Sequence, residues 1–191
     1  NEALFAKVKA VWEQRESLGL EKDQLRLLEK TYKGFTRGGA NLEGEDRQQY
    51  AALNEQLSLA TLKFGRNVLA ATNAFKLNIT DEAKLAGLPQ YVIDLGKQTA
   101  EEAGQQGWTY DLSYPSYGPF MRFCDDRELR RQMYVAYNSR GIGSESDNTG
   151  LVKEIVSLRL QIARLLGYES YADYALETRM LKTPEQVNGF L

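Results

Sequence analysis

The sequence contains no histidine and a single cysteine, Cys124. Histidine is the commonest metal ligand in proteins and the commonest general base near neutral pH. Its absence excludes Ser-His-Asp, Cys-His and H-E-x-x-H chemistry within these 191 residues. One thiol also falls short of the roughly three or four side-chain ligands that a cysteine-based zinc site needs. We therefore expect no catalytic, cofactor-binding or metal-binding residue in this chain, since any catalysis would have to use carboxylates, lysine, tyrosine or Cys124.

One glycine pattern resembles a phosphate-binding loop. Gly141-Ile142-Gly143-Ser144 places two glycines before a predicted helix, where exposed backbone amides attract anions. No strand precedes it, however, and the third glycine and the lysine of such a loop are missing. We interpret this stretch as an ordinary loop between helices.

Two clusters of carboxylates could in principle hold Mg²⁺ or Ca²⁺ through their oxygen atoms. Neither spacing matches a calcium-binding loop, and helix N-termini favour acidic residues through the helix dipole. We interpret both clusters as residues that begin helices. They are Asp125 and Asp126 with Glu128, and Glu145 with Asp147.

Tyrosine and arginine are frequent in the second half of the chain. Tyrosine rings could line a peptide-binding wall, but helix packing with the hydroxyl groups at the surface uses them as well, and we favour packing. We interpret most of the arginines as solvated charges, whereas Arg159, within the apolar stretch 151–166, is expected to pair with a carboxylate. The other residues are Tyr110, Tyr114, Tyr117, Tyr134, Tyr137, Tyr168, Tyr171 and Tyr174, and Arg127, Arg130, Arg131 and Arg140.

The composition of the chain argues against two classes of partner, nucleic acid by its charge and membranes by the length of its apolar runs. Lys and Arg number 24 against 26 Asp and Glu, giving a formal net charge of −2 with both signs spread along the chain. A nucleic-acid-binding surface needs a clustered excess of positive charge, which this distribution does not provide. No apolar run approaches the roughly 18 residues of a membrane span. We expect a soluble protein that binds neither nucleic acid nor membrane.

Apolar side chains recur at intervals of three and four residues, which predicts amphipathic helices. A helix that ends near Gly19 and a second from about Asp23 to Gly38-Gly39 are expected to form a hairpin. Residues 43–75 contain no proline and predict one helix of roughly 50 Å. Since residues 57–75 carry only two charges, we expect neighbours to cover this central helix on more than one side.

The middle of the chain predicts two short strands, at 76–80 and 108–113, which could pair as one small sheet. A helix over 88–103 lies between them. Pro115, Gly118 and Pro119 predict a loop after the second strand.

The C-terminal third predicts helices again. One begins where Asp125 and Glu128 stand three apart in a variant of the capping box, a second covers 151–165, and Ser170 caps a third. Thr183-Pro184-Glu185-Gln186 combines an N-cap, a proline and a glutamine at the positions that open a helix. About two turns are too few for a stable helix, so we expect this one to continue or dock beyond Leu191.

Together these patterns predict an all-α fold: a multi-helix, bundle-like array with a long central helix and at most one small two-stranded β element. No fixed-period repeat and no Pro- or Ser-rich linker divides the chain. We therefore expect one helical region over residues 1–191, with any sub-boundary near 104–115.

Several short stretches, taken in order, form a pattern across essentially the whole chain, ending with Met180 and Thr183-Pro184-Glu185. They resemble the M3 family of zinc oligopeptidases, and within it the bacterial peptidyl-dipeptidases (dipeptidyl carboxypeptidases). The order and spacing carry the resemblance, since no single stretch is specific. The stretches are Leu27-Leu28-Glu29-Lys30-Thr31-Tyr32, Arg37-Gly38-Gly39-Ala40-Asn41-Leu42, Leu85-Ala86-Gly87-Leu88-Pro89, Asp126-Arg127-Glu128-Leu129-Arg130, Asp147-Asn148, Leu158-Arg159 and Ala163-Arg164-Leu165-Leu166-Gly167-Tyr168.

The resemblance implies an all-helical, two-lobed metallopeptidase with a deep channel, in which an H-E-x-x-H helix and a downstream glutamate bind zinc. In such sites zinc activates a water molecule and the glutamate of the motif acts as general base. This chain covers a minority of the family's usual length and has no such helix, so no zinc ligand or catalytic residue of the family can be assigned to any of its positions.

For these residues the resemblance implies a structural role, as the N-terminal part of the channel wall of a hydrolase. The expected partners are short peptide substrates and a C-terminal catalytic lobe, and the expected activity of the parent protein is release of C-terminal dipeptides. We expect a cytoplasmic location, with the periplasm as the alternative. A stand-alone helical interaction module and a histidine-free enzyme that uses carboxylates and tyrosine are the competing functions.

The 191-residue chain alone should bind no stoichiometric zinc and hydrolyse no peptide, because it lacks histidine and has one cysteine. Titration calorimetry with zinc measures the binding, and a peptide digest measures the activity. A tight 1:1 zinc site would contradict this prediction.

Overall fold

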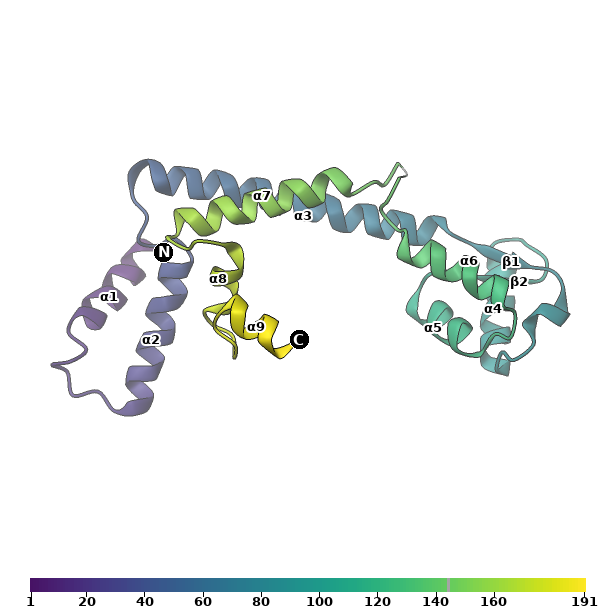
Figure 1. Ribbon diagram of the computed structural model, residues 1–191, viewed down its shortest axis with the longest axis horizontal. Helices are drawn as coiled ribbons and strands as arrows, with labels where there is room; N and C mark the ends of the chain where they lie inside the picture. The colour runs from purple at the N-terminus through teal and green to yellow at the C-terminus, as the bar shows by residue number, and fades with distance from the viewer. Residues whose placement is uncertain (144) are drawn as a thin grey trace. The chain divides into compact units, whose positions relative to one another are not determined.

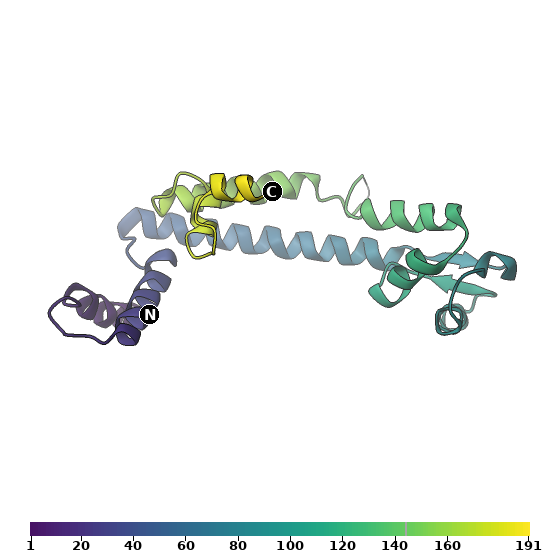
Figure 2. The ribbon, with the colours of Figure 1, turned by 60° about the horizontal axis from the view of Figure 1, so that its bottom comes forward.

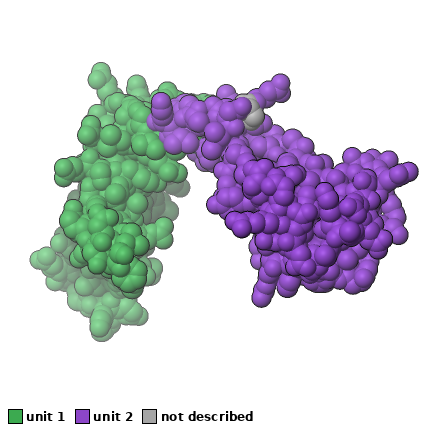
Figure 3. Space-filling view, turned by 45° about the vertical axis from the view of Figure 1, so that its right-hand side comes forward, with its two compact units in different colours: residues 1–59, 155–191 green, residues 60–154 purple. Residues whose placement is uncertain are grey.

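The computed structural model describes residues 1–143 and 145–191. The chain divides into two compact units, one of residues 1–59 and 155–191 and the other of residues 60–154 (Figure 3). The sub-boundary expected near 104–115 falls inside the second unit. In the described part of the chain, no helix combines the length and the apolar character needed to cross a lipid bilayer.

The described residues form nine α-helices, one 3-10 helix and one small sheet (Figure 1). The strands pair antiparallel, with Leu77 opposite Tyr110. The predicted all-α fold with a single two-stranded element is confirmed. The elements are α1 (Glu2–Glu13), α2 (Lys22–Arg37), α3 (Gly44–Ala74), β1 (Leu77–Ile79), η1 (Glu82–Leu85), α4 (Gln90–Glu102), β2 (Trp108–Tyr110), α5 (Tyr114–Phe123), α6 (Arg127–Asn138), α7 (Thr149–Leu165), α8 (Tyr171–Leu176) and α9 (Pro184–Phe190).

Helices α1 and α2 form the predicted hairpin through a stack of rings. Tyr32 of α2 lies between two rings of α1, with its centroid 6.0 Å from that of Phe5 and 4.7 Å from that of Trp12. Arg15 covers the Trp12 ring at 4.3 Å. The prediction that the first helix ends near Gly19 is wrong: α1 ends at Glu13, because turns that include a hydrogen bond from Ser17 N to Gln14 O follow it.

Within the first unit, the N-terminal half of α3 lies beside the C-terminal part of α7 (Figures 1 and 2). Leu53 of α3 and Leu158 and Ile162 of α7 form the buried centre of this contact. Leu57 is half-buried and packs against the same cluster. The periodicity of α3 therefore gives the correct inward face.

The expectation that residues 57–75 are covered on more than one side is wrong for the described chain. Leu59 is 61 % exposed, Leu62 51 % and Leu69 59 %. These three leucines lie on the face of α3 opposite Leu53, as the helical spacing of about 100° per residue requires. The helix has two apolar faces, and the described residues bury only one of them.

The second unit has its own core around the two strands, with α4, α5 and α6 near the sheet (Figure 1). Tyr110 of β2 is fully buried and packs on Phe120 of α5 at 4.7 Å between ring centroids. It also lies against α4 at Gly96, where a Cβ atom would stand 2.6 Å from the tyrosine ring. Glycine is therefore required at this position for the strand and α4 to approach each other.

Two local predictions in this unit are wrong. The loop predicted at Pro115, Gly118 and Pro119 is helix α5. Pro115 stands in its first turn, where the missing N–H has no helical partner to lose, and Pro119 costs one hydrogen bond while the helix buries Phe120 completely. The cap of α6 is Asp126 rather than Asp125, since its side chain accepts from the Glu128 and Leu129 amides.

The facing of α3 is testable with a matched pair of substitutions. Leu57→Asp should lower the free energy of unfolding by about 2 kcal/mol or more, because it places a carboxylate against the buried cluster. Leu59→Asp, on the exposed face of the same helix, should change it by no more than about 0.5 kcal/mol. Urea unfolding followed by circular dichroism measures both, and equal losses would show that the inward face of α3 is misassigned.

Candidate functional site

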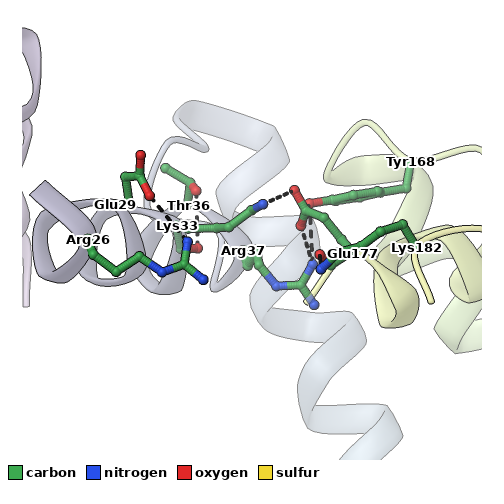
Figure 4. Close-up of polar contacts among 8 residues, drawn as sticks. All are labelled: Arg26, Glu29, Lys33, Thr36, Arg37, Tyr168, Glu177 and Lys182. Atoms are coloured by element: carbon green, nitrogen blue, oxygen red, sulfur yellow. Dashed lines mark hydrogen bonds and ion pairs between the residues drawn. The ribbon is translucent and has the colours of Figure 1, made fainter. Parts of the chain in front are cut away.

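The most densely connected polar group in the first unit is the carboxylate of Glu177, directly after α8. Its Oε1 lies 2.8 Å from Lys33 Nζ, and its Oε2 accepts hydrogen bonds from Arg37 Nη1 and, at 2.7 Å, from the Tyr168 hydroxyl. Figure 4 shows these three side chains converging on the carboxylate. We call Lys33, Arg37, Tyr168 and Glu177 the Glu177 cluster.

Arg37 is the most enclosed member of the cluster, with a side chain that is 14 % exposed. Its guanidinium carbon lies 4.1 Å from the centroid of the Tyr174 ring, which meets the Tyr168 ring edge-on at 5.3 Å. The Tyr174 hydroxyl donates to the main-chain oxygen of Arg37 at 3.4 Å. The arginine is thus fixed by an ion pair on one side and by an aromatic ring on the other.

Local helix signals place these groups. Lys33 and Arg37 are four residues apart on α2, so they share one face. Ser170 caps α8 through a capping box with Asp173, as predicted, and Glu177 is the residue that ends this six-residue helix. The cap sets where α8 begins and so where Glu177 stands opposite α2.

The cluster shifts three acid–base equilibria. Burial alone would raise the pKa of Glu177, but hydrogen bonds from Lys33, Tyr168 and Arg37 lower it to about 2. Burial and the hydrogen bond to Glu177 raise the pKa of Tyr168. Burial by itself would lower the pKa of Arg37, and the hydrogen bond to Glu177 raises it overall. At neutral pH the Glu177 carboxylate is therefore ionised, the Arg37 guanidinium is charged and the Tyr168 phenol is neutral.

This arrangement suits a structural role better than catalysis. A carboxylate with a pKa of about 2 is a poor general base at neutral pH, and both of its oxygen atoms are already engaged. Its contacts instead join α2 to the segment that follows α7. The Glu177 cluster is a set of hydrogen bonds and ion pairs that joins elements more than 130 residues apart in sequence.

A cavity of about 540 Å³ lies beside the cluster. It is bordered by α2 together with Trp12 of α1 and the segment 177–182. Five basic side chains and two carboxylates line it, so the lining carries an excess of positive charge. The lining residues are Trp12, Arg26, Glu29, Lys30, Tyr32, Lys33, Gly34, Thr36, Arg37, Glu177, Thr178 and Lys182.

The glycine pattern at 141–144 lies in the connection between α6 and α7, and Ser144 is outside the described residues. The Gly143 amide donates to Asp147 Oδ1 at 3.2 Å, so the carboxylate of the same loop occupies the place of a bound anion. Hydrogen bonds from Thr149 and Gly143 lower the pKa of Asp147. This geometry agrees with the interpretation as a loop.

The acidic residues around 125–128 are used within the helix start. Asp126 is the cap of α6, and Glu128 forms an ion pair with Arg131 at 2.7 Å. No group of three His, Cys, Asp or Glu side chains among residues 1–143 and 145–191 is arranged to hold a metal ion. These residues do not fit zinc, and the absence of any metal site in the chain stays a prediction.

The tyrosines and arginines are mostly engaged in packing. Tyr117 stacks on Tyr137 at 4.0 Å, and Arg140 covers the Tyr137 ring at 3.7 Å. The expectation of a carboxylate partner for Arg159 is wrong within the described chain, where its guanidinium lies 5.1 Å from the Tyr171 ring centroid. Tyr114, by contrast, is 87 % exposed.

Sequence reasoning did not single out Glu177 or its cluster. Its partners Lys33 and Arg37 lie on a helix about 140 residues earlier, and no local spacing links them. The sequence predicts a packing role for Tyr168 and no site role for Lys33, Arg37 or Glu177. A single sequence holds no pattern from which contacts between such distant residues could be predicted.

Comparison with known proteins relates the chain to one family of peptidases. The model of peptidase family M3 matches residues 120–191. Oligopeptidase A of Haemophilus influenzae is 36 % identical over 173 residues, covering 88 % of this chain and 25 % of that protein. Dipeptidyl carboxypeptidase of Escherichia coli is 33 % identical over 193 residues, covering 100 % of this chain and 28 % of that protein.

The chain is homologous to the peptidases of family M3. A plant relative, the probable cytosolic oligopeptidase A of Arabidopsis thaliana, is 34 % identical over 184 residues, or 93 % of this chain and 26 % of that protein. The resemblance to family M3 is thereby confirmed, while its narrower placement among the peptidyl-dipeptidases stays a prediction. The chain spans about a quarter of the length of the curated relatives that it matches.

The depressed pKa of Glu177 predicts how this M3 homologue responds to acid. A folded-state pKa of about 2, below the unfolded value of about 4.5, stabilises the fold above pH 4.5, and this stabilisation is lost as the pH falls toward 2. Glu177→Gln should therefore lower the free energy of unfolding at pH 7 by about 1–2 kcal/mol, a range reduced because the carboxylate is partly exposed to solvent.

Unfolding by urea at pH 7, 4 and 2.5 measures this difference, which should shrink toward zero at the lowest pH. Glu169→Gln is the control, because Glu169 is exposed and has no ion pair among the described residues. A difference that is the same at all three pH values would contradict the ionic role of Glu177.

Proposed function

We propose that this chain is the N-terminal helical part of a zinc metallopeptidase that cleaves short peptides, and that it forms part of the wall of the substrate channel. The observation that carries the proposal is the homology to oligopeptidase A and dipeptidyl carboxypeptidase over nearly the whole chain. Because the chain spans about a quarter of these relatives, the activity belongs to a longer protein.

The exposed face of α3 supports a structural role within a larger fold. Leu59, Leu62 and Leu69 present apolar side chains to solvent, and Val156 of α7 is 60 % exposed. Exposed apolar side chains of this size, repeated along helices, are typical of surfaces that pack against other protein. We propose that the remainder of the parent protein covers them.

Zinc enters the proposal only through the family. The described residues offer no ligand set for it, so the parent protein would hold zinc in its remaining part, where the metal would activate water for attack on a peptide bond. The proposed part of the described residues is to narrow the channel, because packed helices can limit access to peptides that are short and unfolded.

Two finer assignments belong to the same proposal. Relatives named for oligopeptidase and for dipeptidyl carboxypeptidase activity match at similar identity, and we propose release of C-terminal dipeptides by the parent. We propose a cytoplasmic location, supported by the name of the cytosolic plant relative. A stand-alone helical interaction module is the second candidate, favoured by the same exposed apolar faces.

The decisive experiment compares the 191-residue chain with the protein encoded by its complete gene. The complete protein should hydrolyse an unstructured peptide of about ten residues, lose that activity on zinc chelation and regain it with zinc, whereas the chain alone should be inactive. Mass spectrometry of the products should show successive loss of C-terminal dipeptides.

Amidation of the peptide C-terminus provides the control for dipeptide release. An exopeptidase needs the free carboxylate and should slow strongly, while internal cleavage should be unaffected. A complete gene that encodes only these helices, or a complete protein without zinc-dependent hydrolysis, would overturn the proposal and favour the interaction module.

A further inference from the structure

The cavity beside the Glu177 cluster has more positive than negative groups. Of its two carboxylates, Glu29 is paired with Arg26 at 3.2 Å, and Glu177 is engaged by Lys33 and Arg37. Every acid of the lining is therefore neutralised by a cation of the same lining. Figure 4 shows the Arg26–Glu29 pair on α2 and the contacts of Lys33 and Arg37 with Glu177, which follows α8.

Two basic side chains of the lining remain without a carboxylate. Lys30 has no ion pair among the described residues, and Lys182 uses its ammonium only to donate to the main-chain oxygen of Glu177 at 3.2 Å. They come from α2 and from the segment before α9 respectively. The cavity therefore offers two ammonium groups from separate elements to an anionic ligand.

The apolar part of the lining restricts the type of anion. The rings of Trp12 and Tyr32 face each other at 4.7 Å, and their outer faces are covered by Arg15 and Phe5. Neither ring has a free face for stacking, so only their edges are available. This argues against a ligand held by base stacking, such as a nucleotide, and favours one with small aliphatic groups.

The size of the cavity argues against a lone inorganic ion. Its volume of about 540 Å³ is many times the roughly 30 Å³ that one water molecule occupies in the liquid. Gly34 leaves the α2 side open, since no atom beyond its chain neighbours and the backbone of its own helix lies within 4 Å of where its Cβ would stand. A short extended chain with more than one carboxylate would match both the space and the two separate ammonium groups.

We propose that this cavity binds acidic peptides, with Lys30 and Lys182 each receiving a carboxylate of the ligand. The choice of a peptide rests on the proposed function, because a channel wall of a peptidase meets peptides. The site would favour acidic substrates of the parent protein or retain its acidic products. The residues that form it are proposed to take no part in bond cleavage.

The test measures binding and needs no peptidase activity, so its failure is distinct from a failure of the proposed function. Fluorescein-labelled Ac-Glu-Ala-Glu-Ala is titrated with the 191-residue chain, and fluorescence anisotropy is followed at low and moderate salt. The Glu peptide should bind saturably, with an affinity that falls as the salt concentration rises. The matching Gln peptide should bind at least about tenfold more weakly.

Substitutions locate the site. Lys30→Gln with Lys182→Gln should weaken binding of the Glu peptide about tenfold, since each ammonium loses one charged contact. Lys22→Gln with Lys97→Gln is the matched control, because both lysines are exposed, lie outside the cavity and remove the same total charge. Its affinity should equal that of the unaltered chain.

Charge reversal separates recognition from a structural effect. Lys30→Glu with Lys182→Glu should reject the Glu peptide and bind Ac-Lys-Ala-Lys-Ala instead. Competition with inorganic phosphate tests for a general anion site, and phosphate should displace the peptide only at concentrations that act through ionic strength. Equal loss in the control pair, no change of preference on reversal, or efficient displacement by phosphate would overturn the proposal.

Discussion

The first unit depends on one partly buried ionic contact, between the carboxylate of Glu177 and the cations of α2. Lys33 and Arg37 come from the second helix, while Glu177 and Tyr168 come from the segment that follows α7. An isolated ion pair at a surface contributes little, but here the arginine is enclosed by rings and the carboxylate accepts from three partners. Removing the carboxylate would leave the charge of Arg37 enclosed without its counter-ion, and an uncompensated charge of this kind destabilises the fold strongly.

The same contact determines where chemistry can occur on this unit. Glu177 is paired with both Lys33 and Arg37, and Glu29 with Arg26, so Lys30 and Lys182 are the cations of the cavity lining that have no carboxylate partner among the described residues. The unit therefore combines a rigid junction with a basic cavity. Neither feature activates a nucleophile or a water molecule, which agrees with a part of a peptidase that guides peptides and leaves cleavage to other residues.

Patterns of short range were sufficient to predict most of the fold. The three- and four-residue spacing gave the central helix and its inward face, and caps such as Ser170 and Thr183 marked helix starts that the structure confirms. Helix α5 was missed because Pro115 and Pro119 are read locally as breakers, whereas burial of Phe120 is a tertiary effect. Tertiary packing also explains why Arg159 meets a ring instead of a carboxylate.

The candidate site was less predictable than the fold. Its contacts join residues separated by more than 130 positions, and such pairing has no signature in one sequence. The absence of histidine, in contrast, is visible directly in the sequence, and it excludes histidine-based catalysis and histidine-based zinc binding by these residues. The second apolar face of α3 was also visible in the sequence, but no described residue covers it.

The claim that these helices are part of a larger fold is tested most directly by hydrogen exchange at α9. In the 191-residue chain, the amides from Val187 to Leu191 should exchange almost freely, because a seven-residue helix with exposed Phe190 has little packing to stabilise it. In the complete protein, the same amides should be strongly protected. Equal protection in both would contradict the account and identify the chain as an independent domain.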